Sequence, residues 1–144
     1  MGFIIVGVDG SDIGSRALIW GMRIARALDY QVVAVTGFAI PWTIFLAPTY
    51  QPEDYARDAE EMLERSVTSA REAVPGVPIE SRLVQERPAQ ALVMASHGAQ
   101  LLVVGAHGHG VLPDVHVGSV ANACVNHAKC PVVVYRDPEG PEIV

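Results

Sequence analysis

A glycine-rich stretch at residues 105–119 carries the clearest chemical signal in the sequence. It follows an apolar run at 101–104 and precedes a segment with helical spacing. Glycine has no Cβ, so the backbone at Gly105, Gly108 and Gly118 can turn tightly and bring N–H groups close to an anion. A helix after the stretch would add unpaired N–H donors and the positive end of its dipole. This pattern predicts a phosphate-binding loop.

The polar side chains of the stretch suggest how it would hold phosphate. Ser119 can donate from its hydroxyl, and His107, His109 and His116 change charge near neutral pH. The stretch contains no Lys or Arg and lacks the GK[ST] ending of a P-loop, so backbone N–H groups would provide most of the contacts. Asp114 adds a negative charge, which would either weaken the binding of a polyphosphate or help to hold Mg²⁺ between its phosphates.

A second candidate, Asp9, follows the first apolar run, Phe3–Val8. A dinucleotide-binding domain would carry Gly-x-Gly-x-x-Gly at this turn. The carboxylate of Asp9 would repel a pyrophosphate, but it can accept hydrogen bonds from a ribose hydroxyl or an adenine amino group. Ser11 or Asp12 is expected to cap the helix that follows. We therefore expect the nucleoside near Asp9 and the phosphates at the glycine loop.

The elements that must position these residues alternate along the chain. Strands are expected at Phe3–Val8, Gln31–Thr36, Pro78–Val84, Leu101–Val104 and Pro131–Tyr135, and helices at about 17–28, 56–74, 88–95 and 119–127. This alternation predicts an α/β fold in which a doubly wound, open, five-stranded parallel sheet has helices on both faces. In such folds ligands bind beyond the carboxyl ends of the strands, where the strand order reverses.

Composition narrows the class of protein. The 144 residues are 50% hydrophobic and are expected to form one domain, residues 1–144, with a frayed tail at about 137–144. The net charge of −6 and scattered basic residues argue against nucleic acid, and no apolar run reaches the ~18 residues that would span a membrane. Cys124 and Cys130 have no metal-site spacing, so we expect reduced thiols and a cytoplasmic location. The uncharged, aromatic segment 38–52 is expected to form an ordered flap or contact surface.

These motifs resemble the universal stress protein family, in particular its ATP-binding branch. That branch carries G-x2-G-x9-G-[ST] between the fourth strand and the fourth helix. The fixed positions of the motif are matched here by Gly105, Gly108, Gly118 and Ser119. The resemblance continues at residues 6–11 and 127–136, so it covers nearly the whole chain as a single-domain member. Relatives often have a basic pair after the first motif glycine, whereas Ala106 and His107 stand there in this sequence.

The resemblance implies strand order 3-2-1-4-5 and a regulatory or stress-response module that binds ATP, with ADP or AMP as alternatives and with or without magnesium. It also implies a homodimer that pairs through the last strand, at Val132, Val133, Val134 and Tyr135, and regulatory protein partners of unknown identity. The end of the second strand would supply backbone contacts to adenine. The implied nucleotide contacts are Asp9, Gly37, Gly105, His107, Gly108, Gly118, Ser119 and Val120.

Other functional classes fit the sequence less well. A nucleotide-free interaction module would use the apolar segment and the last strand, with the glycine stretch as a plain connection. A slow ATP hydrolase or phosphotransferase would need a positioned base or a charge clamp at the γ-phosphate, and the spacing implies no such arrangement, so no catalytic residue is assigned. A metal centre at the histidines and Asp114 is disfavoured because His-x-His in this context lacks a zinc-site spacing.

The histidines generate a first prediction. Nucleotide affinity should increase as the pH falls from about 8 to about 6, because the glycine stretch contains three histidines and no residue of fixed positive charge. Titration calorimetry at several pH values measures this directly. A flat profile would remove the histidines from the binding site.

Overall fold

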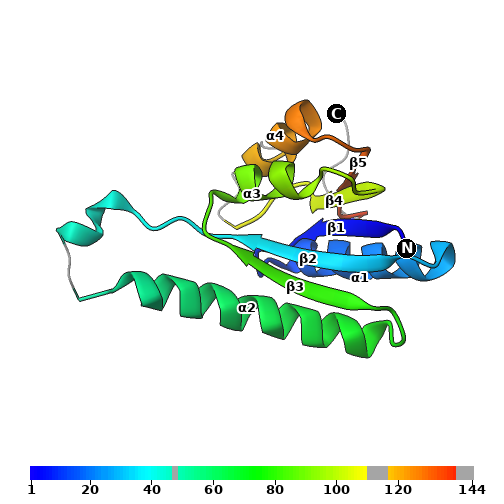
Figure 1. Cartoon of the computed structure of the whole chain (residues 1–144), viewed down its shortest axis with the longest axis horizontal. Coiled ribbons are helices and arrows are strands. Elements are labelled where there is room, and N and C mark those ends of the chain that lie inside the picture. Colours follow the sequence, from blue (N-terminus) through cyan, green and yellow to red (C-terminus); the bar gives the residue numbers. More distant parts are fainter. Residues whose placement is uncertain (47–48, 110–116, 139–144) are drawn as a thin grey trace.

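Five parallel strands form a single sheet in the order β3-β2-β1-β4-β5, the order that the family resemblance implied (Figure 1). The structure is a computed structural model that describes residues 1–46, 49–109 and 117–138. The strands are β1 (Phe3–Gly7), β2 (Gln31–Gly37), β3 (Ile79–Val84), β4 (Leu101–Gly105) and β5 (Val132–Tyr135). The helices are α1 (Asp12–Leu28), α2 (Pro52–Ala73), α3 (Pro88–Ala95), α4 (Ser119–His127) and a short 3-10 helix, η1 (Trp42–Phe45).

Two apolar layers cover the two faces of the sheet. Helices α1 and α2 pack on one face, where Ile4, Val6, Leu18, Val67 and Val103 are almost completely buried. Helices α3 and α4 pack on the other face, over Ile5, Val33 and Leu102, and Cys124 of α4 is buried in the same cluster. Because successive strand residues point to opposite faces, a central strand buried on both sides must be apolar throughout, as β1 and β4 are.

Strand register brings the two predicted halves of the site to one edge. Strand β1 pairs with β2 on one side, from Phe3↔Gln31 to Gly7↔Val35, and with β4 on the other, from Ile4↔Leu101 to Val6↔Val103. The order of the strands reverses at this point, because β2 and β4 connect to opposite sides of β1. The turn after β1 and the glycine loop after β4 therefore begin at the same end of the sheet.

Local signals explain where the helices begin. Ser11 is the N-cap of α1, and its hydroxyl accepts from the backbone N–H of Gly14 at 3.1 Å. Helix α2 begins at Pro52, several residues before the first apolar position that the periodicity indicated. A capping box formed by Gln51 and Asp54 fixes that start, and the Gln51 N–H donates to Asp54 at 2.7 Å.

The apolar segment after β2 extends away from the sheet (Figure 1). Part of it forms η1, a short helix that the sequence analysis did not predict. Trp42 is 75% exposed, Phe45 86% and Leu46 73%, so the segment exposes large apolar side chains rather than packing on the core. Its far end is held to α2 by an edge-on contact of the Tyr50 and Tyr55 rings.

Several residues that the sequence singled out lie outside the described ranges. Residues 139–144, most of the expected frayed tail, lie outside the described residues, whereas Asp137 lies 3.5 Å from Arg16. Asp114 and His116 also lie outside them. No helix in the described ranges is long and apolar enough to cross a membrane.

Both cysteines are free thiols, and their surroundings generate a prediction. Burial raises the pKa of Cys124 to about 11, and burial also raises the pKa of the half-buried Cys130. In the folded protein at about pH 8, a thiol reagent should therefore label Cys130 well before Cys124, because the reagent needs an accessible thiolate. Mass spectrometry of the labelled peptides checks the order, and both sites should react at similar rates in denaturant.

The raised pKa of Cys124 also predicts that the stability of the protein depends on pH. The folded-state pKa of Cys124 is raised, so its contribution to stability is present below the ordinary thiol pKa of 9.0 and is lost as the pH rises towards about 11. The free energy of unfolding should fall across this window. In Cys124→Ala the fall should be smaller, since no buried thiol remains to be protonated at that position. An equal slope in the two proteins would contradict the prediction.

Candidate functional site

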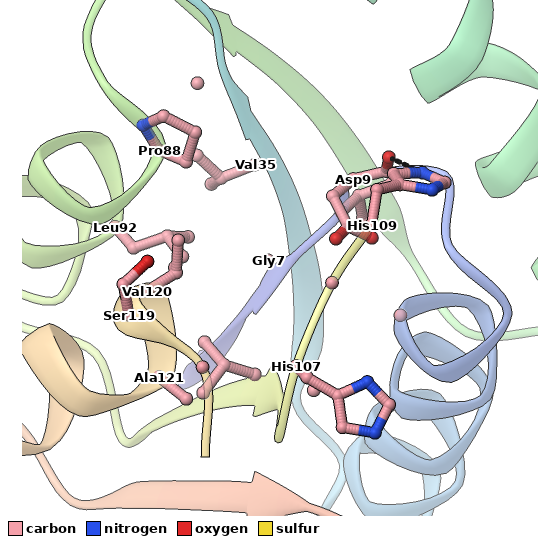
Figure 2. A pocket seen from close by; sticks show the side chains of 17 residues that line it. Gly7, Asp9, Val35, Pro88, Leu92, His107, His109, Ser119, Val120 and Ala121 are labelled. Atoms are coloured by element: carbon pink, nitrogen blue, oxygen red, sulfur yellow. Dashed lines mark hydrogen bonds between the residues drawn. The ribbon is translucent and has the colours of Figure 1, made fainter. Parts of the chain in front are cut away.

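A pocket of about 410 Å³ opens at the carboxyl ends of β1, β2 and β4 (Figure 2). This volume is within the range of ~300–1,000 Å³ that is usual for small-molecule sites. All eight residues that were expected to contact a nucleotide line it: Asp9, Gly37, Gly105, His107, Gly108, Gly118, Ser119 and Val120. The predicted nucleoside end and the predicted phosphate end therefore belong to one cavity.

The carboxylate of Asp9 is held in place by the turn that follows it. Its Oδ1 accepts from the backbone N–H of Ser11 at 2.9 Å and from the Ser11 hydroxyl at 2.5 Å. The same hydroxyl accepts from the N–H of Gly14, so the helix cap and the carboxylate share one side chain. Asp9 itself is exposed at the pocket. A carboxylate fixed in this way is ready to accept a further hydrogen bond from a ligand.

Two glycines make room for this carboxylate. A Cβ on Gly14 would lie 2.6 Å from Oδ1 of Asp9, and a Cβ on Gly108 would collide with Oδ2. The first glycine belongs to α1 and the second to the loop after β4. A glycine is therefore needed at position 108 because any side chain there would collide with Asp9. This reason is separate from a possible contact between the Gly108 backbone and phosphate.

The end of the glycine loop returns close to its beginning. Gly118 is the N-cap residue of α4, and its N–H donates to the carbonyl oxygen of Ala106 at 2.5 Å. A Cβ on Gly118 would lie 3.2 Å from the Cα of His107, tighter than most real contacts. No described side chain caps α4, so the N–H groups of its first turn have no side-chain acceptor there, and the residues of this turn, Ser119 to Ala121, line the pocket.

One wall of the pocket is apolar. Val35 comes from β2, and Pro88 and Leu92 come from α3 (Figure 2). A Cβ on Gly37 would lie 2.8 Å from the Cα of Pro88 and 2.9 Å from the Glu86 carbonyl oxygen, so glycine allows β2 to approach α3. This wall, formed by Val35, Pro88 and Leu92 and called the apolar slot below, suits a weakly polar ring. The sequence analysis singled out Gly37 but not these three side chains.

Charges in the pocket are few. Among the described lining residues, Asp9 is the only carboxylate, the two histidines are His107 and His109, and there is no Lys or Arg. Figure 2 shows the His107 ring pointing away from Leu92 and Ser119, and the His109 ring beside Asp9. Nε2 of His109 lies 2.9 Å from the main-chain oxygen of Asp9.

Metal binding finds no support in the described part of the chain. No group of three or more His, Cys, Asp or Glu side chains there is arranged to hold a metal ion. Asp114 and His116, which the sequence raised as candidates, lie outside that part.

The model of the universal stress protein family matches residues 2–136. A universal stress protein of Mycobacterium tuberculosis is 31% identical over 144 residues, a match that covers 97% of this chain and 45% of that protein. The chain thus spans about half the length of the curated relatives it matches.

Two solved structures combine similar sequence with similar fold. A universal stress protein in complex with cAMP is 27% identical, with a TM-score of 0.68 and coverage of 93% of this chain and 95% of that one. The universal stress protein from Archaeoglobus fulgidus in complex with dAMP is 25% identical, with a TM-score of 0.66 and coverage of 94% and 97%. Together with the family match over nearly the whole length, these comparisons show that the chain belongs to the universal stress protein family.

Proposed function

We propose that the chain binds an adenine nucleotide, with ATP as the expected ligand, and acts as a regulatory or stress-response module in the cytoplasm. The observation that carries the proposal is that the Asp9 carboxylate and the open N-terminus of α4 line the same pocket. Nucleotide complexes of similar proteins support it, since one holds cAMP and another dAMP. Both ligands are adenine nucleotides.

Each part of the pocket suits one part of such a ligand. The slot beside Val35, Pro88 and Leu92 would receive the base, with the backbone at Gly37 against its edge. Asp9 would accept from the ribose. Backbone N–H groups of Gly105, Gly108 and the first turn of α4 would surround the phosphates, together with the Ser119 hydroxyl. The His107 ring, which points away from Ser119, would have to turn to reach them. Magnesium, where present, would be held mainly by the phosphates themselves.

We assign no catalytic role to this pocket. Phosphoryl transfer needs a base or a water-positioning group at the γ-phosphate and a cation that stabilises the transferred charge. Among the described lining residues, the side chains that could serve as a base are Asp9, His107 and His109. No Lys or Arg among the described lining residues is present to stabilise the transferred charge. Hydrolysis, where it occurs, would be slow and incidental.

A homodimer through β5 completes the proposal. Strand β5 is an edge of the sheet, and all four of its residues, Val132 to Tyr135, are only partly buried. An apolar edge strand with unpaired backbone groups favours pairing with a second copy. The carbonyl of Tyr135 accepts from the N–H of Ala106, so the strand is directly joined to the start of the glycine loop. A dimer could thereby respond to nucleotide.

A nucleotide-free interaction module is the second candidate. It is favoured by the exposed side chains of Trp42, Phe45 and Leu46, which form an apolar surface on a segment that extends from the body. On this reading the segment would bind unidentified partner proteins, and the glycine loop would have no ligand.

The phosphate end is tested by Gly118→Val. The branched side chain would enter the space in which Gly118 approaches the backbone of His107, so it should weaken ATP binding at least about tenfold while the protein stays folded. Titration calorimetry measures the affinity, and thermal unfolding measures the fold. Asn122→Val is a matched control, because it adds the same side chain to an exposed position of α4 outside the pocket. Unchanged affinity in Gly118→Val would place the phosphates elsewhere.

The nucleoside end is tested by Asp9→Ala. Loss of a hydrogen bond to a charged group should weaken ATP and adenosine alike, by about tenfold or more. Asp12→Ala removes the same charge from an 85% exposed side chain that does not line the pocket, and it should leave both affinities nearly unchanged. If adenosine binds Asp9→Ala as well as it binds the unmodified protein, Asp9 serves only the turn.

A further inference from the structure

The residues just after β1 are held by one side chain from β2 and by one from the loop after β4. The main-chain oxygen of Val8 accepts from the Thr36 hydroxyl at 2.8 Å, and Thr36 belongs to β2. The next oxygen along the chain, that of Asp9, lies 2.9 Å from Nε2 of His109, which follows β4 (Figure 2). Asp9 is thus fixed through its main chain as well as through its carboxylate.

The hydrogen bond of His109 has only one possible direction. A carbonyl oxygen can only accept, so Nε2 must carry the proton and donate. Nδ1 is then the nitrogen that can gain or lose a proton while the bond persists. The bond is therefore compatible with both the neutral and the cationic ring.

This bond joins the segment after β1 to the segment after β4, at a point where the sheet no longer pairs the two strands. Their pairing ends at Val6↔Val103, three residues before Asp9. Beyond this pair, the segment that contains Asp9 and the segment that begins at Gly105 both line the pocket. Gly108 lies against the Asp9 carboxylate, and the next residue, His109, bonds to the main-chain oxygen of Asp9.

We propose that His109 is a positioning residue, whose bond to the main chain of Asp9 holds residues 106–109 at a fixed distance from the nucleoside end of the pocket. The proposal rests on the proposed function. The position of His109 in a glycine-rich stretch suggested a contact with phosphate. The proposal assigns it a different role. Figure 2 shows its ring beside Asp9 and across the pocket from Ser119, where the phosphates would bind.

The role has a consequence for ligand preference. A loop released from β1 would lose its alignment with the phosphates, whereas adenosine would keep Asp9 and the apolar slot. Loss of the bond should therefore lower affinity for AMP more than for adenosine. One hydrogen bond contributes about 0.5–1.5 kcal/mol, so the expected loss for AMP is about 3- to 10-fold.

The test compares His109→Ala and His109→Gln for the binding of AMP and adenosine. The amide nitrogen of glutamine can replace Nε2 as a donor, so His109→Gln should restore most of the AMP affinity that His109→Ala loses. His97→Ala and His97→Gln are matched controls at an exposed histidine outside the pocket. Thermal unfolding of each variant verifies that the protein remains folded.

A pH series separates positioning from direct contact. If His109 positions the loop, His109→Gln keeps both the AMP affinity and the pH profile of the unmodified protein. A glutamine variant that binds AMP weakly and has lost the pH profile would overturn the proposal in favour of a cationic contact to phosphate. Equal losses for adenosine and AMP in His109→Ala would also overturn it, as would no loss at all.

Hydrogen exchange in the ligand-free protein provides a readout that does not need nucleotide. Amides at residues 106–109 should exchange faster in His109→Ala and recover in His109→Gln, because the loop is released and then tied again. Unchanged exchange in His109→Ala would overturn the proposal even if nucleotide binds. If the unmodified protein binds neither ligand, the proposed function fails, and the exchange data still decide whether His109 ties the loop.

Discussion

The parallel pairing of β1 with β2 on one side and β4 on the other is the constraint on which the rest of the structure depends. The strand order reverses at β1, so the segment after β1 and the segment after β4 lead to helices on opposite faces of the sheet. A gap is left between these two segments. The turn after β1 and the loop after β4 must border that gap. A carboxylate and a helix N-terminus thereby meet in one pocket, although about a hundred residues separate them in the sequence.

Close contacts convert this gap into a shaped site. The carboxylate of Asp9 lies between Gly14 and Gly108, and a side chain on either glycine would displace it. Gly118 approaches His107, and Gly37 approaches Pro88, for the same steric reason. None of these four glycines has a positive φ. The glycines of the pocket therefore provide clearance between neighbouring segments, and the mainly uncharged lining leaves phosphate binding to backbone donors.

Much of this arrangement could be predicted from the sequence. The alternation of strand-like and helix-like apolar patterns predicted the main strands and helices, and the family resemblance implied the strand order. The eight residues expected to contact nucleotide all line the pocket. Their roles in binding stay predictions. Periodicity could not find η1 or the start of α2, because a local helix and a capping box determine them without an apolar pattern.

What the sequence could not supply depends on contacts between distant segments. The clearance that Gly14 provides depends on where the Asp9 carboxylate turns, and the apolar slot combines Val35 with Pro88 and Leu92. The direction of the His109 ring likewise depends on a main-chain oxygen a hundred residues away. The most direct test of the central claim is calorimetric titration of nucleotide-stripped protein with magnesium ATP. We expect saturable binding near one ATP per chain with a Kd on the order of micromolar. No heat at millimolar ATP would contradict it and favour the interaction module.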